Sequence, residues 1–202
     1  MDAKELYHRC TTGRFEEAAY GVDYRVETIN ERVYCFFQGT IFPEGARKWA
    51  DVLVDMDCRP VRSMGKWYLN GFNEALNKSI EQVLDATLED RWAHAYGVTY
   101  AGFSLGGAMA EMFADDSLNP SDRAITFGAP CTRWGLKLKR DKRITQFQIP
   151  NDPVVWHAPV TLGYYHPGVV KWLPWSKGKL LSRDPLECTH MMYADALEKY
   201  NG

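Results

Sequence analysis

Hydrophobic residues fall along this chain in two alternating arrangements, which predict strands and helices that follow one another. The β-prone runs at residues 33–37, 98–103 and 123–127 are typical of buried strands. Over residues 71–89 apolar side chains recur every three or four positions, and residues 105–114 form a second helix-prone run. This order of strand, helix and strand predicts an α/β fold in which helices flank a mostly parallel central sheet.

The N-terminal third is less regular. Residues 3–20 suit a helix interrupted near residues 12–13, because apolar side chains lie among charged ones. Residues 22–29 form a further strand, and the dipeptide Asn30-Glu31 separates it from the next β-prone run, which predicts a hairpin or a turn between neighbouring strands. Residues 57–66 are expected to form a loop.

The C-terminal third predicts short strands and one helix. Residues 143–149 alternate between polar and apolar side chains, as a strand does. Residues 163–168 are rich in aromatic side chains and are typical of a β-hairpin. A loop that carries His190 then leads into a final helix that reaches Tyr200.

Length and composition predict one domain over residues 1–202, large enough to bury a hydrophobic core. The formal net charge of −2 and the pI near 6.2 give no overall attraction to nucleic acid or to an anionic membrane. No stretch approaches the roughly 20 apolar residues of a membrane span. We therefore expect neither a nucleic-acid partner nor a transmembrane segment, and the oligomeric state stays open.

The cysteines and the N-terminus indicate the cellular compartment in which the protein is expected. The five cysteines form no C-x-x-C pair, which is typical of a reducing compartment. The N-terminus is polar and lacks the apolar run of a secretory signal. We expect a cytoplasmic protein, and later release or a phage or virion context also fits. Because Cys, His and Asp residues show no ligand spacing, no metal or other cofactor is expected.

Ser104 is the strongest candidate for chemistry, because it lies in the motif G-x-S-x-G between Gly102 and Gly106. A serine at a sharp turn from strand to helix projects its hydroxyl from the sheet, and the crowded backbone there admits only small neighbours. The β-prone run before the motif and the helix-prone run after it supply that context. The motif therefore predicts a nucleophile; the alternative is a glycine-rich turn whose serine caps the helix.

Two backbone amides are candidates for an oxyanion hole. Acyl transfer through a serine needs two such donors, usually the amide after the nucleophile and one from an earlier loop. Leu105 follows the nucleophile, and Thr40 follows Gly39 at the end of the strand expected at residues 33–37. The alternative for the earlier loop is a simple β-turn.

The amphipathic segment at residues 41–55 comes directly after that loop. If it covers the site, Ile41, Phe42 and Trp49 line an apolar cleft. A surface turn that leads into a short strand fits the pattern equally well. Phe103, beside the nucleophile, is a further candidate to line the acyl site.

Asp152 is the candidate acid. It follows the strand expected at residues 143–149, and functional loops lie at the carboxyl ends of strands in an open α/β sheet. A carboxylate there is suited to orient a histidine. The alternative is an ordinary Asp-Pro turn.

His190 is the favoured base among the five histidines. The sharp turn around Ser104, which we call the elbow, is typical of enzymes whose triad follows the chain order serine, acid, histidine. His8 and His94 precede Ser104 and do not fit this order. A loop histidine after the last strand can reach back over the sheet without disturbing its core. This favours His190, with His166 as the next candidate.

Two segments rich in basic residues have more than one possible role. Residues 132–143 carry six cations against the single acid Asp141, which is usual for a solvated face, with contact to phosphates or lipid head groups as the alternative. A second segment mixes aromatic and apolar residues with lysines. Its members are Lys171, Trp172, Leu173, Trp175, Lys177 and Lys179. We favour a packed hairpin with a solvated edge there over a lipid-contacting surface.

These motifs resemble those of the class 3 lipases, the fungal-type triacylglycerol lipase family of the α/β-hydrolase fold. The resemblance extends from residue 33 to residue 193. Its segments lie at residues 37–40, 49–51, 71–72, 102–108, 126–130, 151–155 and 163–168. Gln38 stands where the family has arginine, and Leu69 where it commonly has histidine.

The resemblance implies a compact α/β-hydrolase fold and a serine carboxylester hydrolase. It identifies Ser104, Asp152 and His190 as the triad, with His190 and Tyr193 in the family's H-x-x-Y, and makes His166 the non-catalytic histidine near the acid. The substrate is expected to be a lipid or another acyl ester, cleaved as by a lipase, esterase or phospholipase A, with transient contact to a lipid interface. An acyltransferase or thioesterase with the same triad, or a catalytically silent binding protein, are the alternatives.

Overall fold

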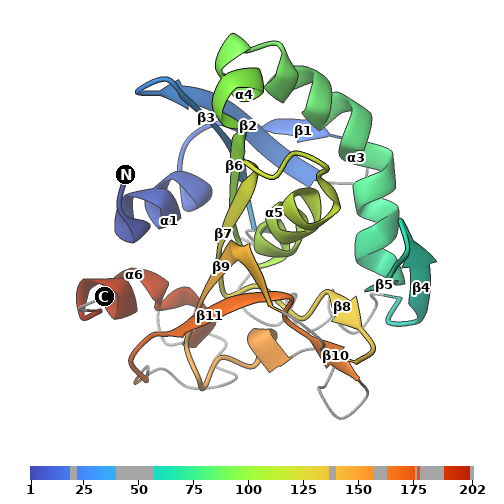
Figure 1. The fold of residues 1–202 in the computed structure, drawn as a ribbon. Helices are drawn as coiled ribbons and strands as arrows, with labels where there is room; N and C mark the ends of the chain where they lie inside the picture. The colour runs from blue at the N-terminus through green and yellow to red at the C-terminus, as the bar shows by residue number, and fades with distance from the viewer. Residues whose placement is uncertain are drawn as a thin grey trace.

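The computed structural model describes residues 1–18, 22–39, 57–136, 140–156, 163–175, 177 and 189–200. Its main feature is a seven-stranded sheet with the strand order β1-β2-β3-β6-β7-β9-β11 (Figure 1). The strands are β1 (Glu16–Ala18), β2 (Val22–Ile29), β3 (Arg32–Phe37), β6 (Val98–Phe103), β7 (Arg123–Phe127), β9 (Asp141–Gln148) and β11 (Gly168–Trp172). Strands β3 to β11 run parallel, and β1 and β2 pair antiparallel at one edge. The predicted mostly parallel sheet is therefore confirmed.

Helices cover both faces of this sheet (Figure 1). One face carries α1 (Ala3–Thr11) and α6 (Tyr193–Glu198), and the other carries α3 (Asn70–Leu88) and α5 (Leu105–Asp116). Each face has its own apolar cluster, because buried strand residues alternate between the two sides. None of the helices in the described ranges combines the length and the hydropathy needed to cross a bilayer.

The helix expected at residues 71–89 is confirmed as α3. Its buried side chains include Phe72, Leu76 and Val83, which recur at helical spacing and pack in the cluster shared with α5. A short helix, α4 (Arg91–Tyr96), follows and begins at Asp90, whose carboxylate accepts a hydrogen bond from the Trp92 amide.

The helices α1 and α6, far apart in sequence, pack together. The rings of Tyr7 and Tyr193 are stacked with centroids 6.2 Å apart, and Lys4 Nζ lies 2.5 Å from the Glu198 carboxylate. Tyr7 also meets Phe103 edge-on at 5.4 Å. The first and last helices of the described chain therefore support each other against the end of β6.

The turn predicted at residues 30–31 is a hairpin between β2 and β3. Asn30 and Glu31 both have positive φ angles, 49° and 62°, as a two-residue type I′ turn requires. The strands on either side are antiparallel, with Ile29 opposite Arg32. This prediction is confirmed.

The loop expected at residues 57–66 is wrong, because part of this segment belongs to a second, four-stranded sheet. Its order is β10-β8-β5-β4, made by β10 (Tyr164–Tyr165), β8 (Arg133–Trp134), β5 (Lys66–Leu69) and β4 (Pro60–Ser63). The hairpin β4–β5 turns at Met64 and Gly65, whose φ angles are 49° and +80°. The strands are only four residues long and β4 is largely exposed, so no hydrophobic alternation marks them.

The hairpin expected at residues 163–168 is also wrong. Strand β10 pairs antiparallel with β8 in the second sheet, whereas β11 pairs parallel with β9 in the main sheet. The chain therefore passes from one sheet to the other within this segment. Gly168 allows the passage, because a Cβ atom there would lie 2.5 Å from the Ile144 side chain.

The helix expected over residues 3–20 ends at Thr11. Thr12 is already extended, Gly13 has a φ of +99°, and β1 begins at Glu16. The predicted interruption near residues 12–13 is therefore confirmed. The helix expected after it is wrong, because residues 16–18 pair with β2 instead.

A buried polar cluster lies between α5 and the two sheets. Glu111 on α5 is fully buried, and its two carboxyl oxygens accept hydrogen bonds from the Thr132 hydroxyl and the Gln146 amide. Gln146 Nε2 and Gln148 Nε2 both lie 3.2 Å from His166 Nδ1. Burial raises the pKa of Glu111 to about 8, so this carboxyl carries a proton at neutral pH.

This protonation predicts a pH-dependent stability. The folded-state pKa of Glu111 is about 8 and its ordinary value 4.5, so between these values only the folded state holds the proton. The free energy of unfolding should fall as pH rises through that window, and Glu111→Gln should remove a few kcal/mol of that decline. Urea unfolding across the window measures it, with the exposed Glu81→Gln as control. Equal slopes for Glu111→Gln and the parent protein would contradict the neutral carboxyl.

Candidate active site

Ser104 occupies a strained turn between β6 and α5. Its φ and ψ angles are 58° and −123°, a region that non-glycine residues seldom occupy. The Ser104 amide donates a 2.8 Å hydrogen bond to the Phe127 carbonyl, which ties the turn to the end of β7. The backbone therefore holds the serine at the carboxyl edge of the sheet, as predicted for a nucleophile.

The glycines of the motif are required by close backbone approaches. A Cβ atom added to Gly102 would lie 2.1 Å from the Gly106 carbonyl oxygen, and one added to Gly106 would lie 2.4 Å from the Phe37 carbonyl oxygen. No side chain fits in either place without moving the main chain. The motif thus packs β6, α5 and β3 together around Ser104.

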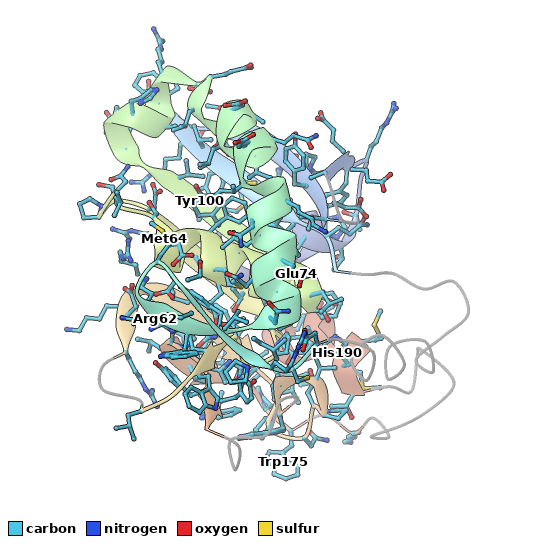
Figure 2. All side chains as sticks on the ribbon, turned by 90° about the vertical axis from the view of Figure 1, so that its right-hand side faces the viewer. Arg62, Met64, Glu74, Tyr100, Trp175 and His190 are labelled. Carbon is cyan, nitrogen blue, oxygen red and sulfur yellow. The ribbon has the colours of Figure 1, made fainter. Side chains whose placement is uncertain are left out.

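Asp152 and His190 reach Ser104 from two later segments. Asp152 follows β9, and His190 lies in the short helix η4 (Thr189–Met191) that precedes α6. His190 Nε2 is 2.8 Å from Ser104 Oγ, and His190 Nδ1 is 2.7 Å from Asp152 Oδ2. The structure therefore brings the three predicted residues into one hydrogen-bonded chain of hydroxyl, imidazole and carboxylate. Figure 2 shows His190 in the lower half of the molecule.

This chain has the geometry of a serine nucleophile with its base. When the carboxylate of Asp152 accepts a hydrogen bond from Nδ1–H of His190, Nε2 is left with a lone pair that can take the Ser104 hydroxyl proton. Ser104 and Asp152 have no exposed surface and His190 has 3%. Electrostatic interactions among them are therefore stronger than they would be in water.

Tyr193 and a backbone amide hold the carboxylate in place. The Tyr193 hydroxyl donates a 2.9 Å hydrogen bond to Asp152 Oδ2 and accepts one of 3.1 Å from the Ile149 amide. The Val154 amide donates a 2.9 Å bond to Asp152 Oδ1. Burial raises the pKa of Tyr193 well above its ordinary value, so its hydroxyl stays a neutral donor. Residue patterns alone did not assign Tyr193 this role; its only signal was the spacing H-x-x-Y.

Tyr193→Phe should lower kcat about tenfold with little change in KM. The substitution removes one donor from Asp152 and leaves the buried Ile149 amide without its acceptor, at a cost of about 1–3 kcal/mol in stability. Ester hydrolysis and thermal unfolding measure the two effects, and Tyr96→Phe on the exposed α4 is the matched control. Unchanged kcat in a folded Tyr193→Phe protein would remove Tyr193 from the site.

Aromatic rings fix the imidazole on its other side. The Phe103 ring stacks on His190 with centroids 4.8 Å apart, and Tyr193 meets His190 edge-on at 6.1 Å. Gly128, with a φ of +58°, leaves room, since a Cβ atom there would lie 3.0 Å from His190 Cε1. The structure thus places Phe103 against the base, and its predicted contact with an acyl chain stays a prediction.

One predicted oxyanion donor lies inside the described residues. Leu105 is the first residue of α5, so its amide belongs to the donors at a helix N-terminus that no intrahelical carbonyl accepts. Thr40 lies outside the described residues, but Gly39 before it packs on the elbow: a Cβ atom at Gly39 would lie 3.2 Å from Ser104 Cβ. Three predicted lining residues, Ile41, Phe42 and Trp49, also fall outside the described residues.

The other histidines of the described chain lie elsewhere. His8 is on α1, His94 is on α4, and His166 belongs to the buried polar cluster, where its Nε2 is 3.0 Å from the Val155 carbonyl. Within the described ranges, no group of three or more His, Cys, Asp or Glu side chains is arranged to hold a metal ion.

Comparison with protein families gives one match. The model of the family described as lipase (class 3) matches residues 35–155, which include Ser104 and Asp152. A comparison with curated proteins gives no match.

Solved fungal lipases share the fold. The lipase from Rhizopus microsporus var. chinensis is 20% identical with a TM-score of 0.61, and the alignment covers 79% of this chain and 60% of that one. Lipase II from Rhizopus niveus is 18% identical with a TM-score of 0.58, covering 91% and 75%. A triacylglycerol lipase whose catalytic centre is a serine-protease triad is 20% identical with a TM-score of 0.62, covering 79% and 65%. The chain therefore spans less than two thirds of the length of two of these relatives.

Proposed function

The chain belongs to the class 3 lipase family, and on this premise we propose that it is a serine carboxylester hydrolase that cleaves acyl esters through an acyl-enzyme. The observation that supports the proposal most directly is the chain of hydrogen bonds from Ser104 through His190 to Asp152. In this arrangement the base can take the hydroxyl proton, and the acid holds the base in the required tautomer.

The proposed reaction has two halves. Ser104 Oγ attacks the ester carbonyl while its proton passes to His190 Nε2, and the same proton goes to the departing alcohol as the acyl-enzyme forms. Water then attacks the acyl carbonyl, gives a proton to His190, and the carboxylic acid leaves as Ser104 recovers the proton. Asp152 stays ionised throughout and stabilises the transient imidazolium.

The negative charge on the carbonyl oxygen needs two donors. We assign these to the amides of Leu105 and Thr40; the position of Leu105 at the start of α5 and of Gly39 against the elbow supports the assignment. The N-terminus of α5 adds a favourable dipole. Each donor of this kind contributes about 3 kcal/mol to transition-state stabilisation.

The substrate class follows from the family and from the surroundings of Ser104. Class 3 family membership and the apolar ring of Phe103 beside the triad support an ester with an apolar acyl group, such as a lipid. One structural relative is described as a triacylglycerol lipase. We therefore propose that the substrates are lipid esters at a lipid–water interface. No metal or organic cofactor takes part in the proposed reaction.

Covalent labelling and a chain-length series test the proposal. Wild type should react one-to-one with a fluorophosphonate at Ser104 and hydrolyse p-nitrophenyl esters, and the acyl length with the highest kcat/KM gives the size of the acyl site. Ser104→Ala should do neither. Absence of labelling in folded wild type would indicate a silent binding protein, and preferential transfer of the acyl group to an added alcohol would indicate an acyltransferase.

A further inference from the structure

Three tryptophan rings are exposed in this part of the molecule: one ends the short helix η2 (Val154–Trp156), and two lie at and after the end of β11. Trp156, Trp172 and Trp175 have 45%, 47% and 74% of their surface exposed. The first two are stacked, with centroids 5.8 Å apart and planes 18° from parallel. Figure 2 shows Trp175 at the lower edge of the molecule, pointing away from the ribbon. Large apolar rings gathered in this way indicate a contact surface.

A groove of about 330 Å³ adjoins these rings. Its walls come from the second sheet and from β11, and include Trp156, Trp172 and Tyr165, with Arg140 at one side. Trp175 follows Trp172 by three residues, beyond the end of β11, and we call the groove and these exposed residues together the tryptophan surface. It is defined by Arg140, Trp156, Tyr165, Trp172, Trp175 and Lys177.

The charge of the tryptophan surface is positive. Arg140 and Lys177 are exposed, and neither forms an ion pair with any residue in the described ranges. The acids of described residues 140–156, 163–175 and 177 are Asp141 and Asp152. Asp141 is paired with Arg143 at 2.8 Å, and Asp152 is buried in the triad. The exposed cations are thus available to an anionic partner.

The tryptophan end of this surface lies at the same edge of the sheet as the triad, whereas Arg140 precedes β9 at the other end of the groove. Strand register places the ends of β6, β7 and β9 side by side, with Phe103 opposite Phe127 and Phe127 opposite Phe147. The next strand continues this edge, with Trp172 opposite Gln148. Ser104 and Asp152 follow β6 and β9 at that edge, and Trp156 comes four residues after Asp152.

In place of the packed hairpin with a solvated edge favoured from the sequence, we propose that the tryptophan surface docks this protein on the surface of an anionic phospholipid bilayer. Tryptophan prefers the boundary between head groups and acyl chains, because its ring is apolar and its N–H is polar. Lys177, two residues after Trp175, and Arg140, at the other end of the groove, would contact lipid phosphates, which complements their charge. Docking by the tryptophan end of the surface turns the Ser104 site towards the lipid. Only that consequence rests on the proposed function, since docking itself needs no catalysis.

Vesicle flotation with catalytically inactive protein tests the docking. Ser104→Ala protein is mixed with phosphatidylcholine vesicles, or with vesicles that also hold about 30% phosphatidylglycerol, at about 0.1 M salt. The parent should bind the anionic vesicles, and the added changes Trp172→Ala and Trp175→Ala should reduce bound protein about tenfold or more. Arg140→Gln with Lys177→Gln should weaken binding about fivefold per charge, on anionic vesicles only.

The control changes an aromatic and a cation at the amino-terminal edge of the parallel strands, away from Trp172 and Trp175. Tyr96 is 53% exposed just before β6, and Arg123 is exposed at the start of β7. Tyr96→Ala with Arg123→Gln should bind vesicles as the parent does. Each change made with Ser104 intact should leave hydrolysis of a water-soluble ester within about twofold, which shows that the variants fold.

Three results would overturn the docking. They are equal binding by the Trp172→Ala, Trp175→Ala protein and its parent, equal loss in the Tyr96→Ala control, and binding that ignores lipid charge. A dimer that dissociates on loss of Trp172 and Trp175, in a protein that does not float with vesicles, would assign the surface to a second copy instead. Failure of ester hydrolysis alone would remove the proposed function and leave the docking result standing.

Discussion

Ser104→Ala and His190→Ala should each lower kcat for ester hydrolysis about a million-fold, with little change in KM. The two side chains act as one unit, because His190 Nε2 is 2.8 Å from Ser104 Oγ and accepts its proton as the bond to the ester forms. Removal of either member disables the other. The double variant should therefore be no slower than the single ones, since the losses are not additive.

Steady-state kinetics on a p-nitrophenyl ester measures this loss, and a fluorophosphonate reports how much nucleophile remains. His94→Ala is the matched control, because His94 lies on α4 away from the elbow. Activity retained in His190→Ala but lost in folded His166→Ala would reassign the base to the histidine of the buried polar cluster. Activity retained in Ser104→Ala would end the acyl-enzyme proposal.

Asp152→Asn should lower kcat about ten-thousand-fold. Three groups donate to this carboxylate: His190 Nδ1, the Tyr193 hydroxyl and the Val154 amide. An asparagine amide has one oxygen and an NH₂ group, so at least one donor must face another donor. The imidazole then loses the partner that holds Nδ1 protonated, and Nε2 no longer presents its lone pair to Ser104. A stability loss of about 1–3 kcal/mol should accompany the kinetic one.

The kinetic effect should appear in kcat, because the buried Asp152 has no surface at which to meet substrate. Asp141→Asn is the control, since that residue pairs with Arg143 at the start of β9, at the other end of the same strand. If Asp152→Asn keeps kcat within about tenfold of wild type, the acid is another residue.

Local patterns accounted for much of the fold. The β-prone runs and the helical stripe of α3 were sufficient because burial leaves a regular trace in sequence. The hairpin at Asn30 and Glu31 was also predictable from the break between two strands. By contrast, β4 and β5 are short and half exposed, and residues 163–168 divide between two sheets, so their structure is set by partners distant in sequence.

The candidate site also has residues that local patterns predict and residues that they do not. Ser104 stands in a local motif, and the order of acid and histidine after it follows from the elbow. The part played by Tyr193 depends on α6 folding back beside β9, which no local pattern reports. The neutral carboxyl of Glu111 likewise needs the packing of α5 against both sheets. Residues whose chemistry comes from long-range burial are the ones that sequence reasoning cannot assign.

The packing of α1 on α6 separates inactivation from unfolding. The base precedes α6, and α6 is supported by Tyr7 and Lys4 of the first helix. The strands and α5 form their own core on the other face. A proteolytic cut between α1 and β1 should therefore loosen α6 and the histidine before it, while the apolar cluster under α3 and α5 stays packed. Loss of activity during storage or protease treatment would then report that α1 and α6 have detached. Unfolding of the sheet would have to be followed separately, for example by circular dichroism.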